Sequence, residues 1–292
     1  MLLIMKKQYS LLFFFIFILG ICNAAISTKE YDALVALYKN TNGNHWIKKW
    51  DLDQPVSKWY GVSIVDNKVV GLNLFRNNLM GKIPKEIGSL KYLEYLNLAF
   101  NNIIGSLPES FTDLSALKVV HIEMNKIGGT IPSSIYKLKN LQEFSAYNNF
   151  LTGSLPQELG ALKNLKILNL SSNNLQGEIP VSLGNLEALE TLGLFENSLV
   201  GRMPHTIVQL KNLKMLFLAN NELSGGVPKG LEQLVNLEML QIQNNNFNSF
   251  LNLELLKESE SLVLDYDKER SSFLFENLDI NTSGMADTIF DD

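Results

Sequence analysis

Side chains that could carry out acid–base, nucleophilic or metal chemistry are few in this 292-residue chain. There are three histidines, His45, His121 and His205, and one cysteine, Cys22, so no intrachain disulfide can form. A metal site or a Cys/His nucleophile pair needs several such side chains close together, and we expect neither a metal nor a cofactor. His121 and Glu123 are two residues apart, a spacing that puts a base and its orienting group on one face of a strand. An isolated pair of this kind favours binding, and we predict that the chain is not an enzyme.

The other charged residues form no recognisable chemical motif. No P-loop, G-x-G-x-x-G or G-x-S-x-G sequence occurs. The stretch Asp265–Glu269 loosely resembles a calcium loop but lacks its glycine and terminal glutamate spacing, so it is interpreted as a solvated acidic segment. The net charge of −5 provides no basic field for a nucleic acid. The acidity belongs to the C-terminal end, because eleven acidic and three basic residues occur from Ser249 onward.

A repeat predicts the elements that position these side chains. Seven of the eight prolines recur at a constant interval of 24 residues: Pro84, Pro108, Pro132, Pro156, Pro180, Pro204 and Pro228. Aligned on this interval, the chain divides into eight segments without insertion or deletion, which begin at Val69, Leu93, Leu117, Leu141, Leu165, Leu189, Leu213 and Leu237. A constant period of this length is the signature of stacked repeats. We therefore predict one solenoid over residues 69–251, although the chain length alone favours two domains.

The segment at residues 165–188, LKILNLSSNNLQGEIPVSLGNLEA, shows the repeat most clearly. Its first half matches the L-x-x-L-x-L-x-x-N-x-L pattern of leucine-rich repeats, which is carried by Leu165, Leu168, Leu170, Asn173 and Leu175. Its second half, GEIP followed by LGNL, resembles the plant-type subclass of that family. The resemblance implies an α/β solenoid, a curved stack with a parallel β-sheet on its concave face and short helical or 3-10 turns on its convex face.

Each repeated position also has a physical role of its own. Leu168 and Leu170 alternate with the period of a strand, and both are expected to face the core. The glycine and proline of each repeat suit a bend toward the outer side, and an apolar pair such as Leu183 and Leu186 suits a helical turn. Because a buried amide must be hydrogen-bonded, the repeated asparagines are predicted to form a structural ladder that bonds the backbone of neighbouring repeats. They are Asn77, Asn101, Asn125, Asn149, Asn173, Asn197, Asn221 and Asn245.

The segments at the two ends of the chain have other roles. Residues 1–24 have the layout of a secretory signal peptide, because Lys6 and Lys7 precede an apolar run and small residues surround a cut before Ala25. That run is shorter than the roughly 20 residues of a membrane-spanning helix, and no later stretch is long and apolar enough to cross a membrane. A retained signal anchor and a lipid-modified Cys22 are the alternatives. Residues 252–292 are predicted to form an acidic C-terminal cap or tail.

Residues 25–68 are predicted to form an N-terminal cap of a helix, a tryptophan-rich segment and the first strand, since a repeat stack leaves an apolar end that needs a cover. Ser27 and Glu30 have the spacing of a capping box, and Trp46, Trp50 and Trp59 follow the helix. The sequence WYGV at residues 59–62 resembles the W-x-G-V of plant-type caps, but the cysteines that flank that motif are absent. The cap is more similar to the cysteine-free caps of bacterial and algal members, which implies a bacterial secretory origin in preference to a plant one.

The strand positions that do not face the core are predicted to form the functional surface. They vary among the repeats and carry rigid aromatic side chains with a few charges, a composition typical of recognition surfaces. The alternative is that the rings only pack on neighbouring strands. The candidate ligand-binding residues are Phe75, Arg76, Tyr95, Phe100, His121, Glu123, Met124, Glu143, Tyr147, Asn148, Phe195, Glu196 and Phe217.

These features together predict a non-catalytic recognition module, secreted or attached to the cell envelope, that binds a protein, peptide or glycan through its concave face. The family resemblance implies the same, because leucine-rich repeat proteins mostly act as interaction scaffolds. Two alternatives stay open. One is an inhibitor of a secreted hydrolase that resembles the polygalacturonase-inhibiting proteins, although the cap cysteines of that group are absent. The other is a structural surface adhesin.

Overall fold

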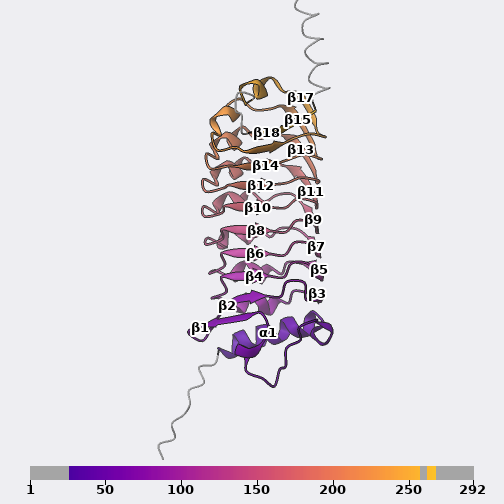
Figure 1. The fold of residues 1–292 in the computed structure, drawn as a ribbon, viewed down its shortest axis with the longest axis vertical. Coiled ribbons are helices and arrows are strands. Elements are labelled where there is room, and N and C mark those ends of the chain that lie inside the picture. Colours follow the sequence, from indigo (N-terminus) through magenta and orange to yellow (C-terminus); the bar gives the residue numbers. More distant parts are fainter. Residues whose placement is uncertain (1–25, 257–261, 268–292) are drawn as a thin grey trace, which may run out of the picture.

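The structure is a computed structural model that describes residues 26–256 and 262–267. These residues form one elongated stack of coils, shown with its long axis vertical in Figure 1. Helix α1 (Thr28–Asn40) lies at one end, and strand β18 (Val263–Asp265) lies near the other. The predicted signal peptide at residues 1–24 and most of the predicted acidic tail lie outside the described residues.

Ten strands form a sheet along the concave side of the stack. From β2 onward they are parallel, and each residue pairs with the residue 24 positions further along the chain, as Leu168 does with Leu192. Only β1 runs antiparallel to its neighbour β2. Leu168 and Leu170 are fully buried, as the alternation predicted. The strands are β1 (Val62–Val65), β2 (Lys68–Asn73), β4 (Tyr95–Asn97), β6 (Val119–His121), β8 (Glu143–Ser145), β10 (Ile167–Asn169), β12 (Thr191–Gly193), β14 (Met215–Phe217), β16 (Met239–Gln241) and β18.

A second parallel sheet of eight strands, which the repeat pattern did not lead us to predict, follows the ladder asparagines. From β5 onward each of its strands buries one side chain, as Leu175 is buried between the exposed Asn174 and Gln176. Figure 1 shows the strands of this sheet beside those of the first. They are β3 (Met80–Lys82), β5 (Asn102–Ser106), β7 (Lys126–Gly129), β9 (Phe150–Gly153), β11 (Asn174–Glu178), β13 (Ser198–Arg202), β15 (Glu222–Gly226) and β17 (Asn246–Ser249).

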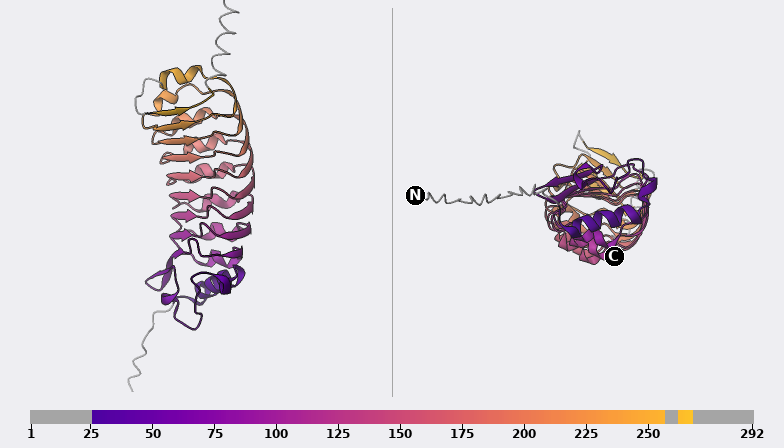
Figure 2. Two further views of the ribbon diagram at one scale, coloured as in Figure 1. Left: turned by 45° about the vertical axis from the view of Figure 1, so that its right-hand side comes forward. Right: turned by 90° about the horizontal axis from the view of Figure 1, so that it is seen from below.

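Short 3-10 helices cover the convex side of the stack. In six repeats the helix starts directly after the repeat proline, whose carbonyl accepts the first hydrogen bond, as Pro180 accepts from Leu183 N at 3.1 Å. Leu183 and Leu186 are fully buried under the sheets. The stack bends gently with the ten-stranded sheet on its inner side (Figure 2). These features confirm the predicted α/β solenoid. The helices are η3 (Lys85–Ser89), η4 (Glu109–Asp113), η5 (Ser133–Lys137), η6 (Gln157–Ala161), η7 (Val181–Asn185), η8 (His205–Gln209) and η9 (Leu231–Gln233).

The N-terminal cover consists of α1, the short helices η1 (Gly43–His45) and η2 (Val56–Lys58), and three buried tryptophans. Ser27 and Glu30 form a complete capping box, because each side chain accepts a hydrogen bond from the backbone N–H of the other. Trp50 and Trp59 stack with ring centroids 4.8 Å apart, and Trp46 meets Trp50 edge-on at 4.9 Å. Their indole N–H groups all donate to backbone carbonyls. The tryptophans therefore close the first coil without leaving a buried indole donor unpaired.

The first sheet continues beyond the last segment of the predicted repeat array. After helix η10 (Leu251–Leu256), strand β18 pairs with β16 in the same register as the earlier parallel strands of this sheet, with Leu264 opposite Leu240. This part of the acidic C-terminal segment therefore adds a rung to the sheet. Within residues 26–256 and 262–267, none of the helices has the length and apolar character needed to cross a membrane.

Candidate binding face

The repeated asparagines hold each coil to the previous one through backbone hydrogen bonds. The side chain of Asn101 donates to Leu74 O and Leu98 O at 2.9 Å each, and its Oδ1 accepts from Asn77 N and Leu79 N at 2.9 and 3.0 Å. The bonds to Leu74 O, Leu98 O and Leu79 N have equivalents in the later repeats, and every ladder asparagine except Asn197 is buried. Both ends of each amide are therefore occupied by backbone groups, which gives these residues a structural role.

The first ladder asparagine is paired with the N-terminal cap, since no repeat precedes it. Asn77 Oδ1 accepts from Lys48 N at 2.6 Å, and Asn77 Nδ2 donates to Lys48 O at 3.3 Å. The cap thus satisfies the amide that a preceding repeat satisfies elsewhere.

The residue before each ladder asparagine has a left-handed backbone in all eight repeats. Its φ angle lies between 46° and 56°, a region that residues other than glycine and asparagine seldom adopt. The hydrogen bonds of the ladder on either side hold this conformation. The chain turns out of the first sheet here, so these residues form one rim of the concave face. They are Arg76, Phe100, Met124, Asn148, Ser172, Glu196, Asn220 and Asn244.

The predicted aromatic residues share the concave face but differ in exposure. Phe75 and Phe100 are 43% and 39% exposed and meet edge-on, with ring centroids 5.2 Å apart. The other four are only half-buried instead of standing free on the sheet, because neighbouring side chains in the stack cover part of each ring. These four are Tyr95, Tyr147, Phe195 and Phe217. The structure therefore brings aromatic residues to both ends of the face.

The centre of the concave face carries a charged cluster that joins two adjacent strands. His121 Nδ1 lies 3.3 Å from Glu123 Oε1, and His121 Nε2 lies 3.6 Å from Glu143 Oε1. The hydrogen bond with Glu123 is the main cause that raises the pKa of His121 above 6.5, with burial opposing it and both carboxylates adding to it. Burial, with the nearby Glu123 carboxylate, raises the pKa of Tyr147. The ring of Tyr95 lies against His121 with centroids 6.2 Å apart.

Glu123 differs from its prediction, because it is buried and does not project from the face. Its exposure is 8%, and Ala99 and Ser145, which also occupy outward strand positions, are buried as well. A strand of the stack has a neighbour on each side at about 4.8 Å, so a short side chain is covered by longer ones on the adjacent rungs. Outward position on the strand therefore does not by itself ensure exposure.

The remaining candidate residues lie along the rim of the same face. Arg76 and Asn148 are exposed, and Met124 is half-buried with its sulfur 2.8 Å from Asn148 Nδ2. Glu196 is exposed and accepts a hydrogen bond from Ser172 Oγ at 2.7 Å. The structure thus places all of the candidate residues on one side of the stack, spread over six repeats.

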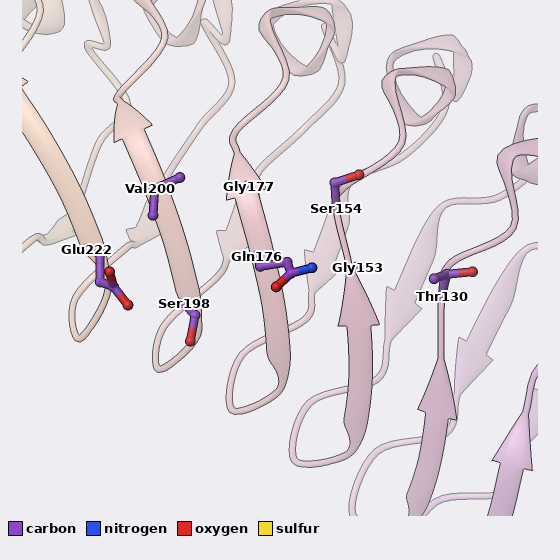
Figure 3. A pocket seen from close by; sticks show the side chains of 8 residues that line it. All are labelled: Thr130, Gly153, Ser154, Gln176, Gly177, Ser198, Val200 and Glu222. Atoms are coloured by element: carbon purple, nitrogen blue, oxygen red, sulfur yellow. The ribbon is translucent and has the colours of Figure 1, made fainter.

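A shallow hollow on the second sheet was not predicted from the sequence. It has a volume of about 660 Å³ and is open to solvent (Figure 3). Two glycines of the repeat pattern line it, and Figure 3 shows mostly polar side chains from successive coils around it. The alternation of polar residues around each buried leucine was the available signal. The lining residues are Thr130, Gly153, Ser154, Gln176, Gly177, Ser198, Val200 and Glu222.

Among the residues that the structure describes, no three histidine, cysteine or acidic side chains are arranged to hold a metal ion. What the fold presents is an apolar core made mostly of leucine, a buried asparagine ladder and an outward sheet face that changes from coil to coil. Such an arrangement defines the class of solenoid scaffold proteins, in which variable surface residues are carried on a constant frame.

The chain belongs to the leucine-rich repeat family. The family model described as "Leucine-rich repeat region" matches residues 71–177 and 152–278. The similarity to the Arabidopsis proteins described below confirms the plant-type resemblance of the repeats. The bacterial origin suggested by the cysteine-free cap stays a prediction.

Three relatives illustrate the similarity. Polygalacturonase inhibitor 1 of Arabidopsis thaliana is 30% identical over 91 residues, which are 30% of this chain and 28% of that protein. The structure of PEPR1-AtPEP1 is 32% identical with a TM-score of 0.68, over 74% of this chain and 31% of that chain. The Arabidopsis receptor kinase HAESA, in complex with the peptide hormone IDA and the co-receptor SERK1, is 28% identical with a TM-score of 0.73. That match covers 82% of this chain and 42% of HAESA, so the chain spans less than half the length of each relative.

Proposed function

We propose that the protein is a non-catalytic recognition module that works outside the cell and binds a peptide, or an extended segment of a protein, along its concave face. The observation that carries this proposal is the gathering of aromatic and charged side chains on the outward face of one sheet. Phe75 and Phe100 in particular expose about two fifths of their surface. Rigid aromatic side chains on an accessible face are typical anchors of protein recognition.

The comparisons favour a peptide over the other ligand classes that the sequence allows. HAESA, which matches most of this chain, holds a peptide hormone in its structure. A peptide also suits the geometry, because an extended chain can follow a sheet face and place alternate side chains against it. A protein or glycan ligand is the less favoured form of the same proposal.

The environment of His121 supports a non-catalytic role. Both of its ring nitrogens face carboxylates, Glu123 on one side and Glu143 on the other. A general base needs a ring nitrogen that is free to take a proton from a nucleophile. The histidine is thus engaged in binding interactions on both sides, and leucine-rich repeat ectodomains are generally binding modules.

An extracellular location is supported by the signal peptide predicted at residues 1–24 and by the similarity to a receptor-kinase ectodomain. Release into the medium and attachment to the cell envelope both agree with this location. Lipid modification at Cys22 and a retained signal anchor are the two forms of attachment that the sequence allows.

The proposal is tested by selecting binders from a displayed library of random peptides. Peptides retained by the wild-type protein are measured again with a double variant, Phe195→Ser with Phe217→Ser, which removes two rings from the concave face. We expect the affinity to fall by roughly a thousandfold, since two buried aromatic anchors contribute about 2 kcal/mol each and every 1.4 kcal/mol is tenfold in affinity. Thermal unfolding of the variant checks that the fold persists.

Phe150→Ser is the matched control, because Phe150 is 55% exposed but lies in β9 of the second sheet. It should leave peptide affinity unchanged. Equal affinity of the wild-type protein and the concave-face double variant would contradict the proposed face, as would a loss of affinity confined to the control.

The second candidate function is inhibition of a secreted polysaccharide-degrading hydrolase. The specific observation in its favour is the similarity to polygalacturonase inhibitor 1. Addition of the purified chain to an endo-polygalacturonase should then lower the rate at which reducing ends are released. An unchanged rate at a molar excess of the chain would exclude inhibition of that enzyme.

A further inference from the structure

The charged cluster at the centre of the concave face is anionic. It contains the carboxylates of Glu123 and Glu143 and a single imidazole, His121, between them. With the imidazole neutral its charge is −2, and with the imidazole protonated it is −1. Within the described residues, no lysine or arginine forms an ion pair with either carboxylate.

One carboxylate oxygen of the cluster is buried and has no partner. Glu123 is 8% exposed, and its Oε2 accepts no hydrogen bond from any described residue. Buried polar atoms in folded proteins are normally hydrogen-bonded, and an unpaired charged one is costly. The free protein therefore holds a negative charge at this position that its own groups neutralise only in part.

The cluster is open to solvent through its other members. The side chains of Glu143 and His121 are 30% and 23% exposed, whereas that of Glu123 is 11% exposed. A cation that approaches from the concave side meets Glu143 first, with Glu123 behind it. Movement of the Glu123 side chain would then let its unpaired oxygen reach the cation.

Two tyrosine rings lie beside members of the charged cluster. The ring of Tyr95 lies beside His121. Burial is the main cause that raises the pKa of Tyr147, and the nearby Glu123 carboxylate adds to it. A planar guanidinium can donate hydrogen bonds to carboxylates while it lies on an aromatic ring, whereas an ammonium group is a compact point charge. The combination of two carboxylates with tyrosine rings therefore suits arginine better than lysine.

We propose that Glu123, His121 and Glu143, bordered by Tyr95 and Tyr147, form a subsite for an arginine side chain of the bound peptide. The subsite rests on the proposed function, since it names the side chain that the peptide presents to the centre of the concave face. Glu143 makes the first contact, and Glu123 supplies the second, buried charge.

The test is a titration with two blocked tripeptides, acetyl-Gly-Arg-Gly-amide and the same peptide with neutral citrulline in place of arginine. Binding is followed by the NMR signals of the His121 imidazole at pH 8. We expect saturable shifts with the arginine peptide and roughly tenfold weaker binding of the citrulline peptide, because the charge-assisted hydrogen bonds are lost. Glu143→Gln should weaken binding of the arginine peptide by a similar factor. Glu123→Gln, the second variant, should also weaken it, because it removes the buried charge.

Glu196→Gln is the matched control, because Glu196 is an exposed carboxylate of the same face that lies two repeats from Glu143 and three from Glu123 and accepts from Ser172. It should bind the arginine peptide as the wild-type protein does. The subsite is overturned by equal affinities for the two tripeptides, by the absence of binding of either, or by unchanged binding to Glu143→Gln. If the library peptides are still lost on substitution of Phe195 and Phe217 in any of these cases, the concave binding face stands and only the arginine subsite falls.

Discussion

Glu30 Oε1 accepts a hydrogen bond of 3.0 Å from Val69 N, although the two residues are 39 positions apart in the chain. The other oxygen of the same carboxylate closes the capping box of α1 by accepting from Ser27 N at 3.1 Å. Glu30 is only 4% exposed. One buried side chain therefore starts the cap helix and fastens it to the first strand of the repeats.

Substitution of Glu30 by alanine should destabilise the junction between the cap and the repeats. It removes the capping interaction and leaves the buried N–H of Val69 without its acceptor, a loss of about 2–3 kcal/mol in the free energy of unfolding. Urea denaturation measures this loss. Asp32→Ala, at an exposed position of the same helix, should cost no more than a few tenths of a kcal/mol. Comparable losses in the two variants would show that the link to Val69 adds nothing.

The asparagine ladder predicts unequal costs at two equivalent positions. Asn125→Ala removes the acceptor of Ile103 N and the donor to Leu98 O and Ile122 O, all in a buried setting. We expect a loss of about 2–4 kcal/mol in the free energy of unfolding. Asn197→Ala should cost less, because Asn197 is the half-buried member of the ladder and water can replace part of its bonding. A larger loss at Asn197 than at Asn125 would contradict the dependence on burial.

His121 makes stability depend on pH. The groups that face it are Glu123, two residues after the end of β6, Glu143 on β8 and Tyr95 on β4. Because the pKa of His121 is raised in the folded state, its stabilising contribution is complete below about pH 6.5 and is lost as the pH rises through the folded-state pKa.

The measurement compares the wild-type protein with His121→Gln by urea denaturation across pH 5 to 9. The difference in the free energy of unfolding should be largest at the acid end and should decline toward the alkaline end. His45 and His205 are common to both proteins and cancel in the difference. A difference that is constant or that grows with pH would contradict the direction of the pKa shift.

The left-handed rim offers a stabilising substitution. Met124 has a φ angle of 55°, whereas the equivalent positions of three other repeats already carry asparagine. Asparagine tolerates this backbone region better than methionine, so Met124→Asn should raise the free energy of unfolding by up to about 1 kcal/mol. Asn148→Met should lower it by a similar amount. Differential scanning calorimetry of the two variants provides the test, and changes of the same sign in both would refute the backbone explanation.

The sequence predicts the scaffold well and the surface less well. A period of 24 residues with leucine or another apolar residue at each core position predicts the first sheet, because strand pairing in register follows once the repeats stack. The second sheet was missed because its strands contain glycines such as Gly177, which propensity assigns to bends. Stacking supplied the hydrogen bonds that single-strand propensity does not count.

The position of each candidate residue within its repeat was predicted from the sequence, but the contacts between the candidate residues were not. Glu123 and Glu143 occupy different positions in different repeats, and nothing in their spacing indicates that both meet His121. The burial of Glu123 depends on which side chains occupy the adjacent rungs. Side-chain packing across the stack therefore decides the exposure of a residue whose position on the strand is already known.

The unbroken register of the first sheet places equivalent side chains at a regular spacing along the concave face. Equivalent side chains on successive strands are about 4.7 to 4.9 Å apart, whereas an extended peptide advances about 3.3 Å per residue. The length of three residues of such a peptide therefore equals two strand spacings within a few tenths of an ångström. Because alternate side chains of an extended peptide point away from the sheet, a peptide that lies along the axis of the stack would bring a side chain back to the same alignment on the same face about every sixth residue, over about four coils.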